Sequence, residues 1–234
     1  MPLNAIEEHR YQLAILFGQL VVKNKAKYSA FSVAFLRQQF HELLGYPAHY
    51  IRSNEDISDA VNLWCEDRVA AEERYGPIGE WKTHKVTNMS RLFHYKENFN
   101  DDISCWNVAS VTNMSCMFYE ARSFNQPLHA WKTSSVTSMA NMLHGARSFN
   151  QPIEGFDTSS VTNMYRMFSE TRSFNQLLGN WNLSSCLDMN SIFNYAKAFD
   201  QDVESWPNWE GKDLEVEDTD SASEEEEDGD DDDA

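Results

Sequence analysis

The chain has 234 residues, of which 41% are hydrophobic and 24% are charged, and these values are typical of one or two globular domains. The net charge of −18 is concentrated in residues 213–234, which hold 14 acidic side chains and neither Lys nor Arg. The rest of the chain is therefore nearly neutral, which excludes a generally basic nucleic-acid-binding protein. No apolar run approaches the ~20 residues of a membrane span, so we expect no integral membrane protein.

Residues 1–56 predict an N-terminal helical region. Apolar residues are dense over 6–22, and residues 31–44 carry an apolar stripe at helical spacing. The first ten residues, MPLNAIEEHR, contain two Glu where a secretory signal peptide has a positively charged segment. We therefore favour a cytoplasmic location. The sequence leaves open whether these helices form a module of their own or extend the helical segment that follows.

Residues 57–75 predict a further helix, which follows a candidate N-cap at Asp56 or Ser58 and stops before Gly76. Its apolar face holds, at helical spacing, Ile57, Val61 and Trp64. We interpret this helix as a cap that covers the first unit of the repeats described next.

Residues 76–209 contain a 25-residue repeat. Seven apolar positions recur at this spacing without an insertion, among them an aromatic column and a methionine column: Trp81, Trp106, Trp131, Phe156, Trp181 and Trp206, and Met89, Met114, Met139, Met164 and Met189. A unit of this length cannot bury its own apolar face, whereas stacked units form a continuous core. We predict an α+β solenoid of about five to six leucine-rich-repeat-like coils, each with one short strand and one short helix or 3-10 turn. After the last coil, Trp206 and Trp209 either fold over it or meet a partner.

Two polar columns follow the same spacing. We expect a structural ladder of asparagines, because buried backbone groups at the corners of coils need hydrogen-bond partners; its members are Asn100, Asn125, Asn150 and Asn175. A basic column, which Glu97 begins, consists of Arg122, Arg147, Arg172 and Lys197. Two interpretations of this column stay open. It is either a solvated corner offset by Glu120 and Glu170, or an anion-binding stripe for an acidic protein segment, including the acidic residues of this chain.

The units WNVASVTNMSCMFYEARSFNQPLHA and WKTSSVTSMANMLHGARSFNQPIEG resemble the BspA-type leucine-rich repeat, a 25-residue class also seen in mycoplasma lipoproteins. The resemblance covers about residues 75–206, and the preceding segment ISDAVNLWCEDRVAAEERYGPIGEW resembles the helical lead-in of such arrays. It implies a non-enzymatic solenoid used for adhesion or protein interaction, often on cell surfaces, with no catalytic residue set.

We predict no catalytic, cofactor-binding or metal-binding residues. The four cysteines are far apart without a CxxC pair, so we expect reduced thiols at Cys65, Cys105, Cys116 and Cys186. His94 and His144 share a register but lie two coils apart, about 10 Å on the spacing of strands, which is too far for one metal ion.

The segment SASEEEEDGDDDDA is strongly charged and free of large apolar residues, so we predict that residues 210–234 form a disordered acidic tail. This tail either adds solubility or docks onto a basic partner. The function we expect for the chain is a non-enzymatic protein–protein interaction scaffold. Two alternatives stay open: a secreted or cell-surface adhesin of the BspA type, and a regulatory subunit or docking module of an enzyme complex.

Overall fold

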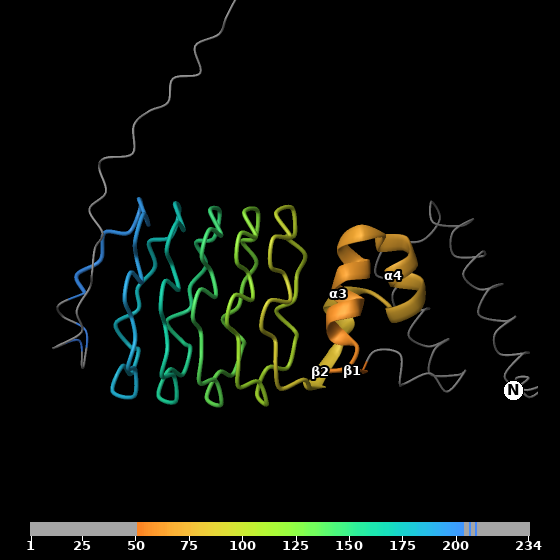
Figure 1. Ribbon diagram of the computed structural model, residues 1–234, viewed down its shortest axis with the longest axis horizontal. Helices are drawn as coiled ribbons and strands as arrows, with labels where there is room; N and C mark the ends of the chain where they lie inside the picture. The colour runs from red at the N-terminus through yellow and green to blue at the C-terminus, as the bar shows by residue number, and fades with distance from the viewer. Residues whose placement is uncertain (1–50, 204–205, 207–208, 210–234) are drawn as a thin grey trace, which may run out of the picture.

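The computed structural model describes residues 51–203 together with residues 206 and 209 (Figure 1). The helices expected within residues 1–50 and the disorder expected for residues 210–234 lie outside the described residues. The described elements are, in chain order, β1 (Ile51–Ser53), α3 (Ile57–Glu66), α4 (Arg68–Tyr75), the 3-10 helix η2 (Ile78–Glu80) and β2 (Lys82–Lys85). From β2 onward the chain winds through successive coils that lie side by side, with the helices at one end of the stack (Figure 1).

The helical segment before the coils is two helices, where the sequence predicts one. The break falls at Asp67, which has extended backbone dihedrals (φ −140°, ψ 90°) and whose side chain accepts a hydrogen bond from the Ala70 amide at 3.0 Å. Asp67 therefore caps the start of α4, because a side-chain oxygen there satisfies an amide that has no partner within the helix. Of the two candidate caps, Asp56 precedes α3 but makes no side-chain bond to it.

The backbone of each coil is built from turns that alternate with bonds to the next coil. In one coil, the amides of Cys116 and Phe118 donate to carbonyls of the following coil, at 2.9 and 2.8 Å. The intervening amide of Met117 closes a turn within its own coil, at 3.1 Å to the Met114 carbonyl, and the next amide, of Tyr119, does the same at 3.2 Å to the Cys116 carbonyl. The coils are also joined by single parallel bridges between residues 25 positions apart, which run through Asn88, Asn113, Ser138, Asn163 and Asp188.

The short strand and the short helix expected in each coil are replaced by this arrangement. Two residues of the coil, Cys116 and Glu120, have positive φ values of 56° and 53°, and the equivalent residues of the other coils do the same. A right-handed helix requires negative φ throughout. Two positive φ values four residues apart in each coil therefore prevent an α-helix from forming there, and the segment closes as consecutive turns instead.

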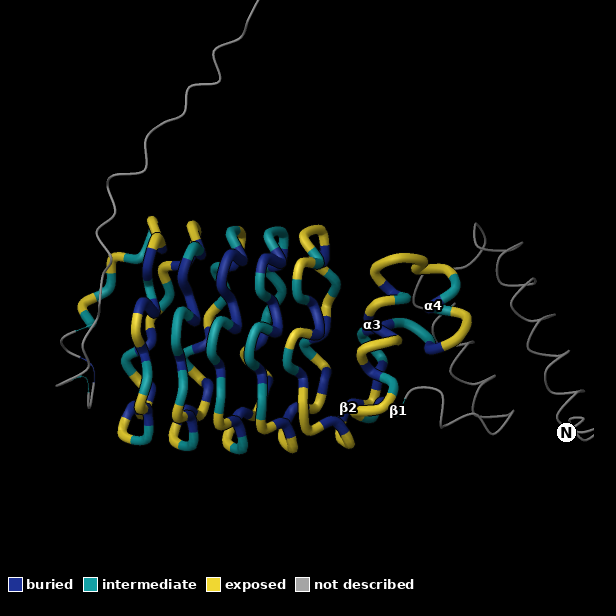
Figure 2. The backbone as a smooth tube through the Cα atoms, viewed as in Figure 1, coloured by how far each residue is buried: buried dark blue, intermediate teal, exposed yellow. Residues whose placement is uncertain are grey.

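The apolar columns face the interior of the stack, as the buried stretches in Figure 2 show. The Phe column from Phe99 to Phe199 stacks with ring centroids 5.8–6.1 Å apart and planes within 13° of parallel. The Met column is buried from Met89 to Met189. In the aromatic column, the indole N–H of Trp131 donates to the Ile103 carbonyl of the preceding coil at 3.3 Å. Such bonds satisfy the polar edge of a buried Trp and tie adjacent coils together.

Aromatic rings cover both described ends of the stack. At the first coil, Trp64 of α3 packs edge-on against Trp81, with ring centroids 6.1 Å apart and an interplanar angle of 80°, while β1 pairs in parallel with β2. At the last coil, Trp206 packs edge-on against Phe199 at 6.3 Å, and Trp209 packs on Trp206. Of the two interpretations of the final tryptophans, the structure therefore has the one in which they fold over the last coil.

Candidate interaction surface

The basic column lies at one corner of the coils, two residues after the second positive-φ position of each unit. Backbone bonds fix this corner to the preceding coil: the Ser123 amide donates to the Glu97 carbonyl at 2.9 Å, and the Ser148 amide donates to the Arg122 carbonyl at 3.1 Å. Because this position recurs every 25 residues in coils that are bridged at the same spacing, cations at this sequence position stand in neighbouring coils along one side of the stack.

Arg122 is neutralised by two carboxylates. Its Nε donates to Glu120 Oε2 at 2.8 Å and its guanidinium contacts Glu97 Oε2 at 3.1 Å, and the hydrogen bond to Glu120 raises the pKa of Arg122. Glu120 is buried over Gly145 of the next coil. A Cβ at Gly145 would lie 2.3 Å from Glu120 Oε1, so only glycine leaves room for this carboxylate.

The other three cations of the column form what we call the open stripe: Arg147, Arg172 and Lys197. Among the described residues, none of the three has a carboxylate within ion-pair distance. Arg172 and Lys197 are exposed, whereas Arg147 is half-buried and its Nε is shielded from water without a hydrogen-bond partner. Glu170, the remaining carboxylate near the column, faces His144 instead, at 3.7 Å from its Nε2. The stripe therefore presents uncompensated positive charge along several coils.

A stack of three rings lies beside the stripe. Tyr119 stands between His94 and His144, with ring centroids 4.9 and 4.5 Å away. Burial lowers the pKa of His144, against the opposing effect of Glu170 and Glu120, and Arg166 lowers this pKa further. Burial therefore favours the neutral form of this imidazole. Because Tyr119 separates the two histidines, they do not share a ligand.

The asparagine column makes hydrogen bonds between coils. Each Asn Oδ1 accepts the backbone amide of the next Asn, as in the bonds of 2.9 Å from Asn125 to Asn100 and 3.0 Å from Asn150 to Asn125. The neighbouring glutamine joins the same oxygen: Gln151 Nε2 donates to Asn125 Oδ1 at 3.0 Å. Asn175 extends the series by donating to Asn150 at 3.0 Å. The side-chain oxygens of the asparagines are thus used in hydrogen bonds between coils at this corner. We therefore assign this network a structural role.

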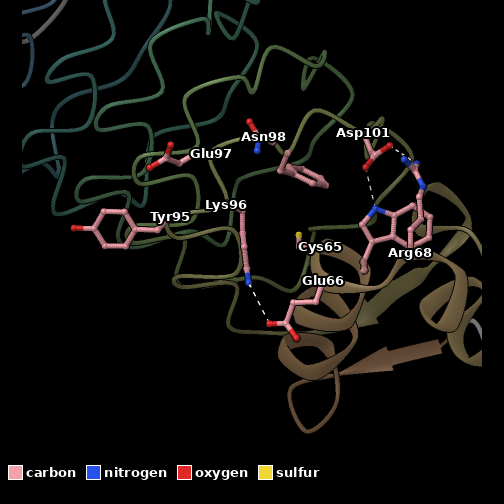
Figure 3. A pocket seen from close by; sticks show the side chains of 10 residues that line it. Cys65, Glu66, Arg68, Tyr95, Lys96, Glu97, Asn98 and Asp101 are labelled. Carbon is pink, nitrogen blue, oxygen red and sulfur yellow. Dashed lines mark hydrogen bonds and ion pairs between the residues drawn. The ribbon is translucent and has the colours of Figure 1, made fainter.

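A cavity of about 560 Å³ lies between α3 and the first coil, and Figure 3 shows the side chains that line it. Four of its charged groups pair with one another, and the fifth, Glu97, pairs with Arg122 outside the cavity. Asp101 accepts hydrogen bonds from Trp64 Nε1, at 2.9 Å, and from the Arg68 guanidinium, while Lys96 lies 4.0 Å from Glu66. Cys65 is exposed, but partial desolvation by the surrounding protein raises its pKa, which disfavours a reactive thiolate. The cavity thus holds no uncompensated charge comparable to that of the open stripe.

The described residues contain no group of three or more His, Cys, Asp or Glu side chains placed to hold a metal ion. The four cysteines are free thiols, and only Cys186 is buried. In this part of the chain, no helix has both the length and the apolar character needed to cross a membrane.

These coils, with their matched columns and aromatic ends, define a repeat protein. The profile of the family described as "Mycoplasma protein of unknown function, DUF285" matches residues 67–157 and, a second time, residues 129–223. The two matches together span more than half of the chain, which therefore belongs to this family. No curated protein and no solved structure matches the chain.

Sequence spacing placed the members of the basic column in equivalent positions, but it treated them as one set. The structure separates Arg122, which two carboxylates hold, from the three cations of the open stripe. The glycine at position 145 is the signal that marks this difference, because it breaks a column otherwise made of Tyr and Glu. The stack of His94, Tyr119 and His144 was missed as a unit, although its 25-residue spacing is visible in the sequence.

Proposed function

We propose that this chain is a non-enzymatic protein–protein interaction scaffold, built as a leucine-rich-repeat-type solenoid of the BspA-like kind, and that the open stripe is its contact surface. The observation that carries the proposal is the row of cations without carboxylate partners on a regular side of the stack. Repeat arrays bind partners along such extended surfaces. A partner with an acidic segment supplies the missing charges, and these charge-assisted hydrogen bonds are stronger than neutral ones.

Burial supports a contact role for this side of the stack more than a role in folding. Arg172 and Lys197 are exposed and join no buried network among the described residues. Exposed cations of this kind contribute little to the stability of a fold. Electrostatic complementarity, by contrast, steers partners toward a surface and selects among them.

The proposal is tested by capture on the immobilised full-length protein from an extract of its source cells, with quantitative mass spectrometry. One variant reverses the three charges of the open stripe to Glu. The matched control reverses three exposed lysines elsewhere, Lys82, Lys85 and Lys132, and so changes the net charge equally. We expect specific partners to be retained by the control and lost, by at least tenfold, with the stripe variant. Partners lost equally from both variants, or from neither, would contradict the open stripe as the contact surface.

A further inference from the structure

Carboxylate partners are distributed unevenly along the basic column that contains the open stripe. At the first position of the column, Glu97 and Glu120 provide two carboxylates for one guanidinium. At the next position, the Arg147 Nε is excluded from water and has no acceptor among the described residues. Buried polar groups in folded proteins nearly always have a hydrogen-bond partner. An external carboxylate reaches the solvent-exposed part of the half-buried Arg147 side chain rather than its shielded Nε, and the exposed Arg172 and Lys197 continue the same row without a carboxylate among the described residues.

The chain carries a segment of matching chemistry. Residues 213–234 contain 14 acidic residues and no Lys or Arg, and the acidic residues are densest over SASEEEEDGDDDDA. No other stretch of this length in the chain has such a charge. A row of cations one coil apart, about 4.8 Å on the spacing of strands, suits an extended segment that has a carboxylate at nearly every residue.

The route from the end of the coils to the stripe is short. Trp209 packs on Trp206, which in turn contacts Phe199 of the last coil, and Lys197 belongs to that same coil. The acidic segment begins four residues after Trp209. From Lys197 back to Arg147 the stripe spans two coil steps, roughly 10 Å, whereas 22 extended residues reach about 70 Å. Covalent attachment also gives such a segment a high effective concentration at the stripe.

We infer that residues 213–234 bind along the open stripe of their own chain, with carboxylates on Arg147, Arg172 and Lys197. This inference rests on the proposed function and deepens it, because a partner must displace the segment to reach the stripe. The acidic segment then acts as an internal competitor. It excludes weakly charged proteins and admits partners that present a denser or better-ordered row of carboxylates.

The test is zero-length cross-linking of the full chain with a carbodiimide, which joins lysine amines directly to carboxylates. Peptide mapping of the monomeric product at low ionic strength is expected to show Lys197 joined to residues 213–234. The internal control is Lys132, an exposed lysine at another corner of the coils, which is expected to give at least fivefold less of this product. An Arg172→Lys variant is expected to add a second cross-linked site, and 0.5 M salt is expected to remove both, because screening weakens exposed contacts.

Charge reversal supplies the matched comparison. Arg172→Glu, at an exposed position, is expected to reduce the Lys197 cross-link several-fold, whereas Lys132→Glu leaves it unchanged. Equal yields at Lys197 and Lys132, or products found only in cross-linked dimers, would overturn the inference. If Lys197 gives no cross-link while the stripe variant still loses its captured partners, the internal docking fails and the proposed function stands.

Discussion

Asn54 completes the backbone ladder at the first coil. Within the stack, a threonine carbonyl accepts the amide of the next coil's threonine, as Thr87 does for Thr112 at 2.8 Å. The first coil has no such threonine before it. There, Asn54 Oδ1 accepts the amides of Thr87 at 2.9 Å and Asn88 at 3.1 Å, and Asn54 Nδ2 donates to Thr87 Oγ1 at 2.7 Å. The side chain thereby replaces the carbonyl of a missing coil.

The substitution Asn54→Ala removes these three hydrogen bonds. Each contributes about 0.5–1.5 kcal/mol net in a typical protein, and the exposure of Thr87 and Asn88 lets water replace part of that. We therefore expect a loss of about 1–2 kcal/mol in the free energy of unfolding, comparable with the loss of a helix N-cap. For a chain of this size, that corresponds to a fall in Tm of about 2–8 °C.

Amide hydrogen exchange and thermal unfolding measure this effect. Asn54→Ala is expected to speed the exchange of the Thr87 and Asn88 amides, while amides of the central coils keep their protection. Asn54→Asp retains the acceptor and loses the donor, so it should fall between wild type and Asn54→Ala. The control is Asn98→Ala, at an exposed asparagine of the same coil. Unchanged exchange at Thr87 and Asn88 in Asn54→Ala would refute the assigned cap.

Three further predictions concern the interior. Phe156→Trp introduces an indole N–H of the kind that Trp106, Trp131 and Trp181 direct at a backbone carbonyl 28 residues earlier. Its acceptor would be the Leu128 carbonyl, and the variant is expected to be more stable by about 1 kcal/mol in chemical denaturation. Met139→Asp places an unpaired charge in a fully buried column and is expected to abolish cooperative unfolding. His144, whose pKa burial lowers from its ordinary 6.5, binds a proton less readily in the folded state than in the unfolded state. Its contribution to stability is therefore present above pH 6.5 and lost as the pH falls toward the lowered pKa, so His144→Tyr should reduce the loss of stability between pH 7 and 5.

The outcomes that would contradict these predictions are distinct. A less stable Phe156→Trp would mean that the aromatic column has no space for an indole at that coil. A Met139→Asp variant that melts like wild type would refute the buried Met column. An unchanged pH dependence in His144→Tyr would assign the acid sensitivity to other groups, and His94, whose pKa is also lowered by burial, is the next residue to replace.

The burial of the apolar columns follows directly from the repeat. When Met, Val and Phe recur every 25 residues, like side chains meet between stacked units, and the columns become the core whatever the backbone does in between. The backbone conformation inside each unit, by contrast, does not follow from the spacing of the repeat. Positive φ values occur at residues such as Arg91, Cys116 and Glu120. Unlike glycine, these residue types do not indicate a positive φ in a sequence. The period specifies which residues stack, and the turn geometry depends on hydrogen bonds to the next coil.

The candidate surface was partly visible for the same reason. The 25-residue spacing locates the basic column. It also makes Glu120 and Glu170 equivalent, although the two carboxylates have different partners in the structure. Glu120 lies over Gly145 and reaches Arg122. The equivalent position above Glu170 is Tyr195 rather than glycine, and Glu170 faces His144. The three-dimensional register is therefore needed to tell which cations of the column have a carboxylate partner.

Hydrogen–deuterium exchange by mass spectrometry can locate the contact surface of the protein without any substitution. The protein is compared alone and as the complex recovered from the capture experiment. If the open stripe is the contact surface, exchange in the complex is slower over residues 143–151 and 168–176, which carry the Arg147 and Arg172 corners, and unchanged over 129–136 at another corner. Protection confined to residues 129–136, or to α3 and α4, would contradict this role of the open stripe.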